Sequence, residues 1–206
     1  MATVYSEERN VVDGELALAR LKAGNARFVA GTSRAPSLES QLLDDQADGQ
    51  QPYATILGCS DSRVPPELIF DAWLGELFVV RVAGNVLGPS ILGTLQYATR
   101  HLATPLFVVL GHERCGAVDA AISYRFDGVR QAQRIETLLE EIIPALDGLD
   151  PALAKHDLVK AAVEANVRNT VAKLAESPEG RSQLARGVKL VGAIYDLHTG
   201  GVRFLD

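Results

Sequence analysis

Features that mark several large classes of protein are missing from this chain. No apolar run approaches the roughly 20 residues needed to cross a bilayer, and residues 1–8 lack the basic and apolar regions of a signal peptide. Basic residues are not in excess, because the chain has 20 Lys and Arg and 26 Asp and Glu. The net charge of -6 does not indicate a surface that binds nucleic acid. We therefore expect a cytoplasmic protein with no membrane and no nucleic-acid partner.

Motifs that bind nucleotide phosphates are also missing. Gly84 and Gly88 follow a predicted strand, but neither G-x-x-x-x-G-K-[ST] nor G-x-G-x-x-G occurs. Internal repeats, linkers and low-complexity blocks are absent too, and 206 residues are enough to bury the core of one domain. We predict a single domain over residues 1–206, with a helical arm over about 1–50 and an α/β core over about 51–206.

The order of the expected strands and helices predicts the fold class. We expect strands at 53–58, 77–82, 106–111 and 188–197, and a turn at 199–201 that leads into 202–204. Helices are expected at 15–29, 90–102, 115–124, 130–145 and 152–175, with shorter ones near 38–45 and 65–70. This order predicts an α/β fold with a mostly parallel central sheet flanked by helices.

Cysteine is scarce, and its placement is informative. The chain has two cysteines, and each lies in a short segment, 58–63 or 111–116, that follows an apolar run bounded by glycine. Such runs are typical of buried strands in a parallel sheet. If the two strands are neighbours, their carboxyl ends bring Cys59, His112 and Cys115 together, where open α/β sheets place their ligand sites.

The chemistry of these three side chains indicates a metal site. Two thiolates and one imidazole suit zinc, and three protein ligands leave a fourth position open for water, as in catalytic zinc sites. The alternative is a pair of small buried hydrophobes, which is ordinary for free cysteines inside cells. His112 lies three residues before Cys115, which favours the metal site. A disulfide is the weaker rival, because no targeting segment indicates an oxidising compartment.

At these residues the sequence resembles the β-class carbonic anhydrases. Their motif C-x-D-x-R is complete at residues 59–63, and H-x-x-C is complete at 112–115. The resemblance also covers residues 78–85 and 162–167 and extends from about residue 15 to the C-terminus. It implies one Zn²⁺ per chain on Cys59, His112 and Cys115, and reversible hydration of carbon dioxide to bicarbonate and a proton by zinc-bound hydroxide. It also implies a homodimer or homotetramer, with the N-terminal arm lying across a neighbouring subunit; a helix packed on its own domain fits the residues equally well.

The resemblance assigns roles to further residues. Asp61 would orient the hydroxide, and Arg63 would hold Asp61 in a bidentate pair, the open arrangement. If that pair broke, Asp61 could bind zinc itself, which is the closed arrangement. The motif does not choose between the two. Gln50 and Tyr97 would contact substrate, and the amide of Gly116 at a helix start would hold bicarbonate. The plainer alternatives are a surface ion pair for Asp61 and Arg63, a solvated loop glutamine, and a core or interface tyrosine.

One departure from the family concerns regulation. Relatives regulated by bicarbonate carry a tryptophan where this chain has Ile56, although Arg81 and Tyr195 match the other two members of their regulatory pocket. This favours the unregulated, open type. Two other functions remain: hydrolysis of carbon disulfide or carbonyl sulfide at the same metal centre, and a non-catalytic protein stabilised by zinc or bearing reactive thiols.

Overall fold

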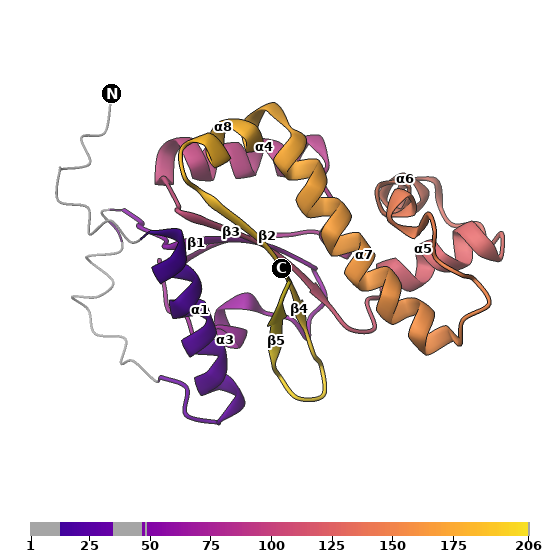
Figure 1. Cartoon of the computed structure of the whole chain (residues 1–206), viewed down its shortest axis with the longest axis horizontal. Coiled ribbons are helices and arrows are strands. Elements are labelled where there is room, and N and C mark those ends of the chain that lie inside the picture. The colour runs from indigo at the N-terminus through magenta and orange to yellow at the C-terminus, as the bar shows by residue number, and fades with distance from the viewer. Residues whose placement is uncertain (1–12, 35–46, 48, 206) are drawn as a thin grey trace.

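Five strands form one sheet between two layers of helices in the part of the chain that the structure describes (Figure 1). The structure is a computed structural model, and it describes residues 13–34, 47 and 49–205. The strand order is β2-β1-β3-β4-β5. The first four strands run parallel, and β5 pairs antiparallel with β4. The predicted α/β fold with a mostly parallel sheet is confirmed.

The strands lie close to where the sequence predicts them. Their bounds are β1 Ala54–Gly58, β2 Leu77–Arg81, β3 Leu106–His112, β4 Lys189–Tyr195 and β5 Val202–Phe204. Strands β1 and β3 are neighbours, and Gly58 pairs with Leu110. Both strands therefore end at the same edge of the sheet, as the cysteine placement requires.

Strand β3 is buried on both faces, which explains its unbroken apolar sequence. Leu106, Val108 and Leu110 pack with the helices α1 (Gly14–Val29) and α3 (Pro66–Ile69). The alternate residues Phe107 and Val109 point into the core on the opposite face. Successive side chains of a strand point to opposite faces, so one strand contributes to both cores.

The second layer of helices covers the other face of the sheet. It consists of α4 (Pro89–Tyr97), α5 (Gly116–Phe126), α6 (Gln133–Ile142), α7 (Lys155–Glu176) and α8 (Pro178–Ala185). Figure 1 shows α7 running diagonally across the sheet, with α5 and α6 beyond one end. None of the helices described is long and apolar enough to cross a membrane.

The predicted helices at 90–102, 115–124 and 152–175 are confirmed, with local differences. A π-helical turn, Ala98–Leu102, continues α4. The helix expected at 130–145 begins at Gln133, and its last part, Ile143–Leu146, is a separate 3₁₀ turn with Pro144 in its first positions. Helix α8 was not predicted, although Ser177 caps it by accepting a hydrogen bond from the Gly180 amide.

Helix α1 packs on the sheet of its own chain. Asp13 caps its start by accepting a hydrogen bond from the Leu16 amide at 2.7 Å, and Ala17 and Leu21 are fully buried against the sheet. Helix α1 thus packs on its own domain, one of the two alternatives, and a contact of the arm with a neighbouring subunit stays a prediction. The short helix expected at 38–45 and the first twelve residues of the arm lie outside the described residues.

Close packing of α1 on the segment after α3 requires glycine at position 24. A Cβ atom added to Gly24 would lie 1.8 Å from the carbonyl oxygen of Phe70. The substitution Gly24→Ala therefore forces α1 away from its contact, and we expect the free energy of unfolding in urea to fall by roughly 1–3 kcal/mol. Gly93→Ala in α4 is the control, because nothing lies within 4 Å of the added Cβ; helix propensity predicts that it raises stability by up to about 1 kcal/mol. Equal effects of the two substitutions would contradict this packing.

Candidate metal centre

Three side chains that can bind a metal converge at the carboxyl edge of the sheet. Cys59, His112 and Cys115 are all buried, and their ligand atoms lie within 4.8 Å of one another. The two sulfur atoms are 4.0 Å apart. The structure thus brings together the three residues that the sequence predicts as ligands.

The ends of two strands position these ligands. Cys59 directly follows β1, His112 is the last residue of β3, and Cys115 is the N-cap of α5. Between the last two, Arg114 adopts a left-handed backbone conformation with φ of 52°, which few residues other than glycine do. This reversal lets His112 and Cys115 approach the same point from consecutive elements.

The imidazole of His112 presents one free nitrogen to the site. Its Nδ1 lies 2.8 Å from the carbonyl oxygen of Glu113. A carbonyl can only accept, so Nδ1 donates and Nε2 carries a lone pair. Nε2 is buried and has no hydrogen-bond partner among the residues described. A buried polar atom without a partner is costly, and a metal ion bound to Nε2 would satisfy it.

The two thiols fit the same ion. They are free cysteines, and their 4.0 Å separation is far longer than a disulfide. Two thiolates bound tetrahedrally to zinc at ~2.3 Å lie roughly 3.8 Å apart. The hydrogen bond between them lowers the pKa of Cys59, helped by the Gly84 amide, and it raises the pKa of Cys115 together with burial. The pair therefore holds one proton, and its donor set suits zinc.

Asp61 and Arg63 form the bidentate pair that the sequence predicts. Nε of Arg63 donates to Oδ1 of Asp61 at 2.9 Å, and Nη2 donates to Oδ2 at 2.7 Å. These hydrogen bonds hold the pKa of Asp61 well below its usual range. Oδ2 of Asp61 lies 3.9 Å from Nε2 of His112, so the carboxylate sits at the rim of the metal cluster and is not an isolated surface group.

Arg81 fixes the backbone that carries Cys59 and Asp61. Its Nε donates to the carbonyl oxygen of Cys59 at 2.9 Å, and its Nη2 donates to that of Asp61 at 2.5 Å. In the sequence Arg81 matches only a member of a regulatory pocket. Arg81 pairs with Gly58 across β1 and β2, which places it beside the loop that carries Cys59 and Asp61. A single sequence carries no signal for that strand register.

The predicted substrate contacts Gln50 and Tyr97 are both exposed in this chain, and their roles stay predictions. Gln50 is exposed in the segment before β1. Tyr97 ends α4 and is 49% exposed; its ring lies 6.3 Å from that of Phe78 and 4.6 Å from that of His101. Gly116, the third predicted contact, is the first residue of α5, directly after Cys115.

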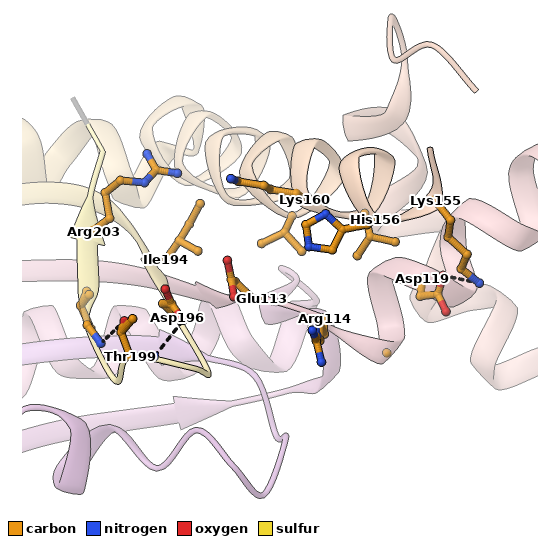
Figure 2. Close-up of a pocket in the computed structure, with 15 residues that line it drawn as sticks. Glu113, Arg114, Asp119, Lys155, His156, Lys160, Ile194, Asp196, Thr199 and Arg203 are labelled. Atoms are coloured by element: carbon orange, nitrogen blue, oxygen red, sulfur yellow. Dashed lines mark hydrogen bonds and ion pairs between the residues drawn. The ribbon is translucent and has the colours of Figure 1, made fainter. Parts of the chain in front are cut away.

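A cavity of about 680 Å³ adjoins the metal cluster without including it. Its walls come from the loop between β3 and α5, the start of α7 and the hairpin between β4 and β5. Figure 2 shows Glu113 and, from α7, His156 and Lys160 around this cavity. Gly116 also lines it, so the helix start beside Cys115 is open to this hollow.

The chain is similar in sequence to carbonic anhydrases. A family model described as carbonic anhydrase matches residues 54–202. Carbonic anhydrase 2 of Mycobacterium tuberculosis is 42% identical over 183 residues, which cover 87% of each chain. The carbonic anhydrase of Mycolicibacterium smegmatis is 40% identical over 185 residues, which cover 88% of each chain.

Solved structures show the same relationship. The β-carbonic anhydrase CafA of Aspergillus fumigatus matches with a TM-score of 0.72 and 28% identity, over 93% of this chain and 90% of CafA. A tetrameric β-carbonic anhydrase from Sordaria macrospora matches with a TM-score of 0.73 and 25% identity, over 93% of this chain and 95% of the other. Sequence and fold therefore indicate the same family.

The shared proton of Cys59 and Cys115 has a measurable consequence. Both thiols must be deprotonated to bind a metal, and the opposite pKa shifts leave one proton on the pair near pH 7.5. Metal-free protein at this pH should therefore carry about one thiolate per chain, whereas two thiols of ordinary pKa would both be largely protonated. The ultraviolet absorption of the thiolate, compared between the metal-free protein and Cys59→Ser, measures this. The need for deprotonated thiols also predicts that zinc affinity falls as pH falls, and metal-free protein without thiolate absorption at this pH would contradict the coupling of the two thiols.

Proposed function

The chain belongs to the β-carbonic anhydrase family, and from this we propose that it hydrates carbon dioxide reversibly to bicarbonate and a proton, using one Zn²⁺ per chain held by Cys59, His112 and Cys115. The observation that carries the proposal is the buried Nε2 of His112, which faces two buried thiols and has no hydrogen-bond partner within residues 13–34, 47 and 49–205. An Asp–Arg pair at the rim of the same cluster supports it.

Zinc, when bound, supplies a Lewis acid that lowers the pKa of water toward neutrality and makes hydroxide available as a nucleophile. The protein supplies the donor set and its surroundings. The carbonyl of Glu113 holds the tautomer of His112 that leaves Nε2 free. Arg81 holds the loop from which Cys59 and Asp61 project.

Asp61 orients the attacking group in this mechanism. Arg63 keeps the carboxylate ionised, so Asp61 can only accept hydrogen bonds. By accepting a hydrogen bond, the carboxylate of Asp61 would orient a water or hydroxide at the rim of the cluster toward carbon dioxide. The two hydrogen bonds from Arg63 engage both carboxylate oxygens of Asp61, which supports the open arrangement of the site.

Three further residues complete the proposed substrate site. The amide of Gly116, at the start of the 11-residue helix α5, would hold bicarbonate. Gln50 and Tyr97 would contact substrate at the active site of a neighbouring subunit. The exposure of Tyr97 supports a contact with a second copy of the chain.

The proposed assembly and location follow the same reasoning. We propose a homodimer or homotetramer, since closed symmetry is the general expectation for homo-oligomers and the Sordaria macrospora relative is tetrameric. Free buried thiols suit a reducing compartment such as the cytoplasm.

The role of Asp61 is tested by Asp61→Asn, which keeps the size of the side chain and removes its charge. We expect zinc content to stay at one per chain and kcat/KM for carbon dioxide hydration to fall by about 100-fold or more, measured by stopped flow on zinc-quantified protein. Asp147→Asn is the control, because Asp147 forms an exposed ion pair with Arg125 away from the metal ligands in the sequence. Full activity of Asp61→Asn would exclude the orienting role. Zinc-loaded wild type that turns over carbonyl sulfide or carbon disulfide but not carbon dioxide would overturn the proposed substrate.

The role of Arg63 is tested through the pH profile. Since Arg63 holds the pKa of Asp61 below its usual range, the pair persists at neutral pH and wild-type hydration should continue near pH 7. In Arg63→Ala the released carboxylate can compete with hydroxide for the metal, and hydroxide is scarcer at lower pH. We expect the activity profile of this variant to move to higher pH. An unchanged profile, at equal zinc content, would show that Arg63 does not control the position of Asp61.

A further inference from the structure

Two hydrogen bonds in series join helix α7 to the first cysteine of the metal cluster. Nδ2 of Asn166 donates to the carbonyl oxygen of Gly84 at 2.8 Å. The amide of the same Gly84 donates to Sγ of Cys59, with the two atoms 3.4 Å apart. Asn166 is 1% exposed and lies 82 residues from Gly84 in the sequence, so only the tertiary fold brings the three residues together.

The backbone at Gly84 is enclosed on its other side. Gly84 has a φ of 69°, a region that glycine enters at no steric cost. A Cβ atom there would lie 2.7 Å from Cδ1 of Ile142 and 3.2 Å from Cβ of Ala117. The backbone of Gly84, which carries no side chain, therefore lies with its amide and its carbonyl between the metal cluster and helices α5 and α6.

The amide at position 166 differs from its neighbours on α7. The neighbouring inward-facing residues of α7, Ala162, Val163 and Val167, are apolar and buried in the same core. Burying an amide costs free energy unless it is hydrogen-bonded, and Oδ1 of Asn166 has no partner among the described residues. The bond to Gly84 is thus the specific contribution of this side chain, and it acts on the peptide segment that touches Cys59.

We propose that Asn166 is a positioning residue of the metal centre: by holding the carbonyl of Gly84 it aims the Gly84 amide at the sulfur of Cys59. The proposal rests on the zinc site of the proposed function and deepens it. An N–H donor withdraws charge from a thiolate, so Cys59 donates less charge to a bound metal ion than a bare thiolate would. Hydrogen bonds that other groups make to metal ligands orient those ligands and tune the metal. The loss of one typically lowers metal affinity or activity by about 10- to 100-fold.

The test compares Asn166→Leu with Asn169→Leu. Leucine is close to asparagine in size and cannot donate a hydrogen bond. Asn169 lies one turn further along α7, is half-buried, and its Nδ2 has no hydrogen-bond partner in the described part of the chain. The measurements are the zinc dissociation constant from chelator competition, the thiolate-to-cobalt absorption band of the Co²⁺-substituted protein, and Tm of the metal-free protein.

We expect Asn166→Leu to raise the zinc dissociation constant by about 10- to 100-fold and to shift the cobalt band, while Asn169→Leu leaves both as in the wild type. The metal-free Tm separates these changes from a loss of folding.

If Asn166→Leu does not fold, Asn166→Ser tests the same bond, because its hydroxyl is too short to replace the amide. A folded variant of Asn166 with wild-type zinc affinity and cobalt band would overturn the proposal. Wild-type protein that binds zinc normally but hydrates no carbon dioxide would instead overturn the proposed function and leave this inference standing.

Discussion

The parallel pairing of β1 with β3 sets the position of every candidate ligand. Gly58 pairs with Leu110, so Cys59 leaves β1 at the level where β3 continues to His112. A slip of one residue would move Cys59 by ~3.3 Å along the sheet and reverse the faces of β1. Such a slip is opposed by the burial of β1 and β3 on both faces, because it would exchange the side chains of the two cores.

Side chains become more polar and more exposed from the metal cluster outward. The three ligands are buried, and the nearest contacts that orient them come largely from backbone: the Glu113 carbonyl for His112 and the Gly84 amide for Cys59. Asp61 and Arg63 lie further out, with side chains 18% and 53% exposed. A buried donor set beside a more accessible carboxylate suits the proposed small substrate, which needs few binding contacts of its own.

Much of the fold and the core of the site were predictable because their signals are local. The apolar runs predicted the four parallel strands to within about two residues, and the glycine, cysteine and histidine placements predicted the convergence of Cys59, His112 and Cys115. Helix α8 was missed because its eight residues are largely polar and only its cap signals it. Helix α6 was overextended because Pro144 is tolerated in the 3₁₀ turn that follows it.

The sequence by itself determined the fold class, the three candidate ligands and the Asp61–Arg63 pair, because strand patterns, thiol and imidazole chemistry and contacts over two residues depend on neighbours in the chain. Only the tertiary structure decided that Arg81 holds the loop of Cys59 and Asp61, that α1 packs on its own sheet, and that Asn166 reaches the turn at Gly84. These contacts join residues 20 to 82 positions apart or set one element against another. They depend on strand register and on the path of α7 across the sheet, and no local pattern in one sequence carries either.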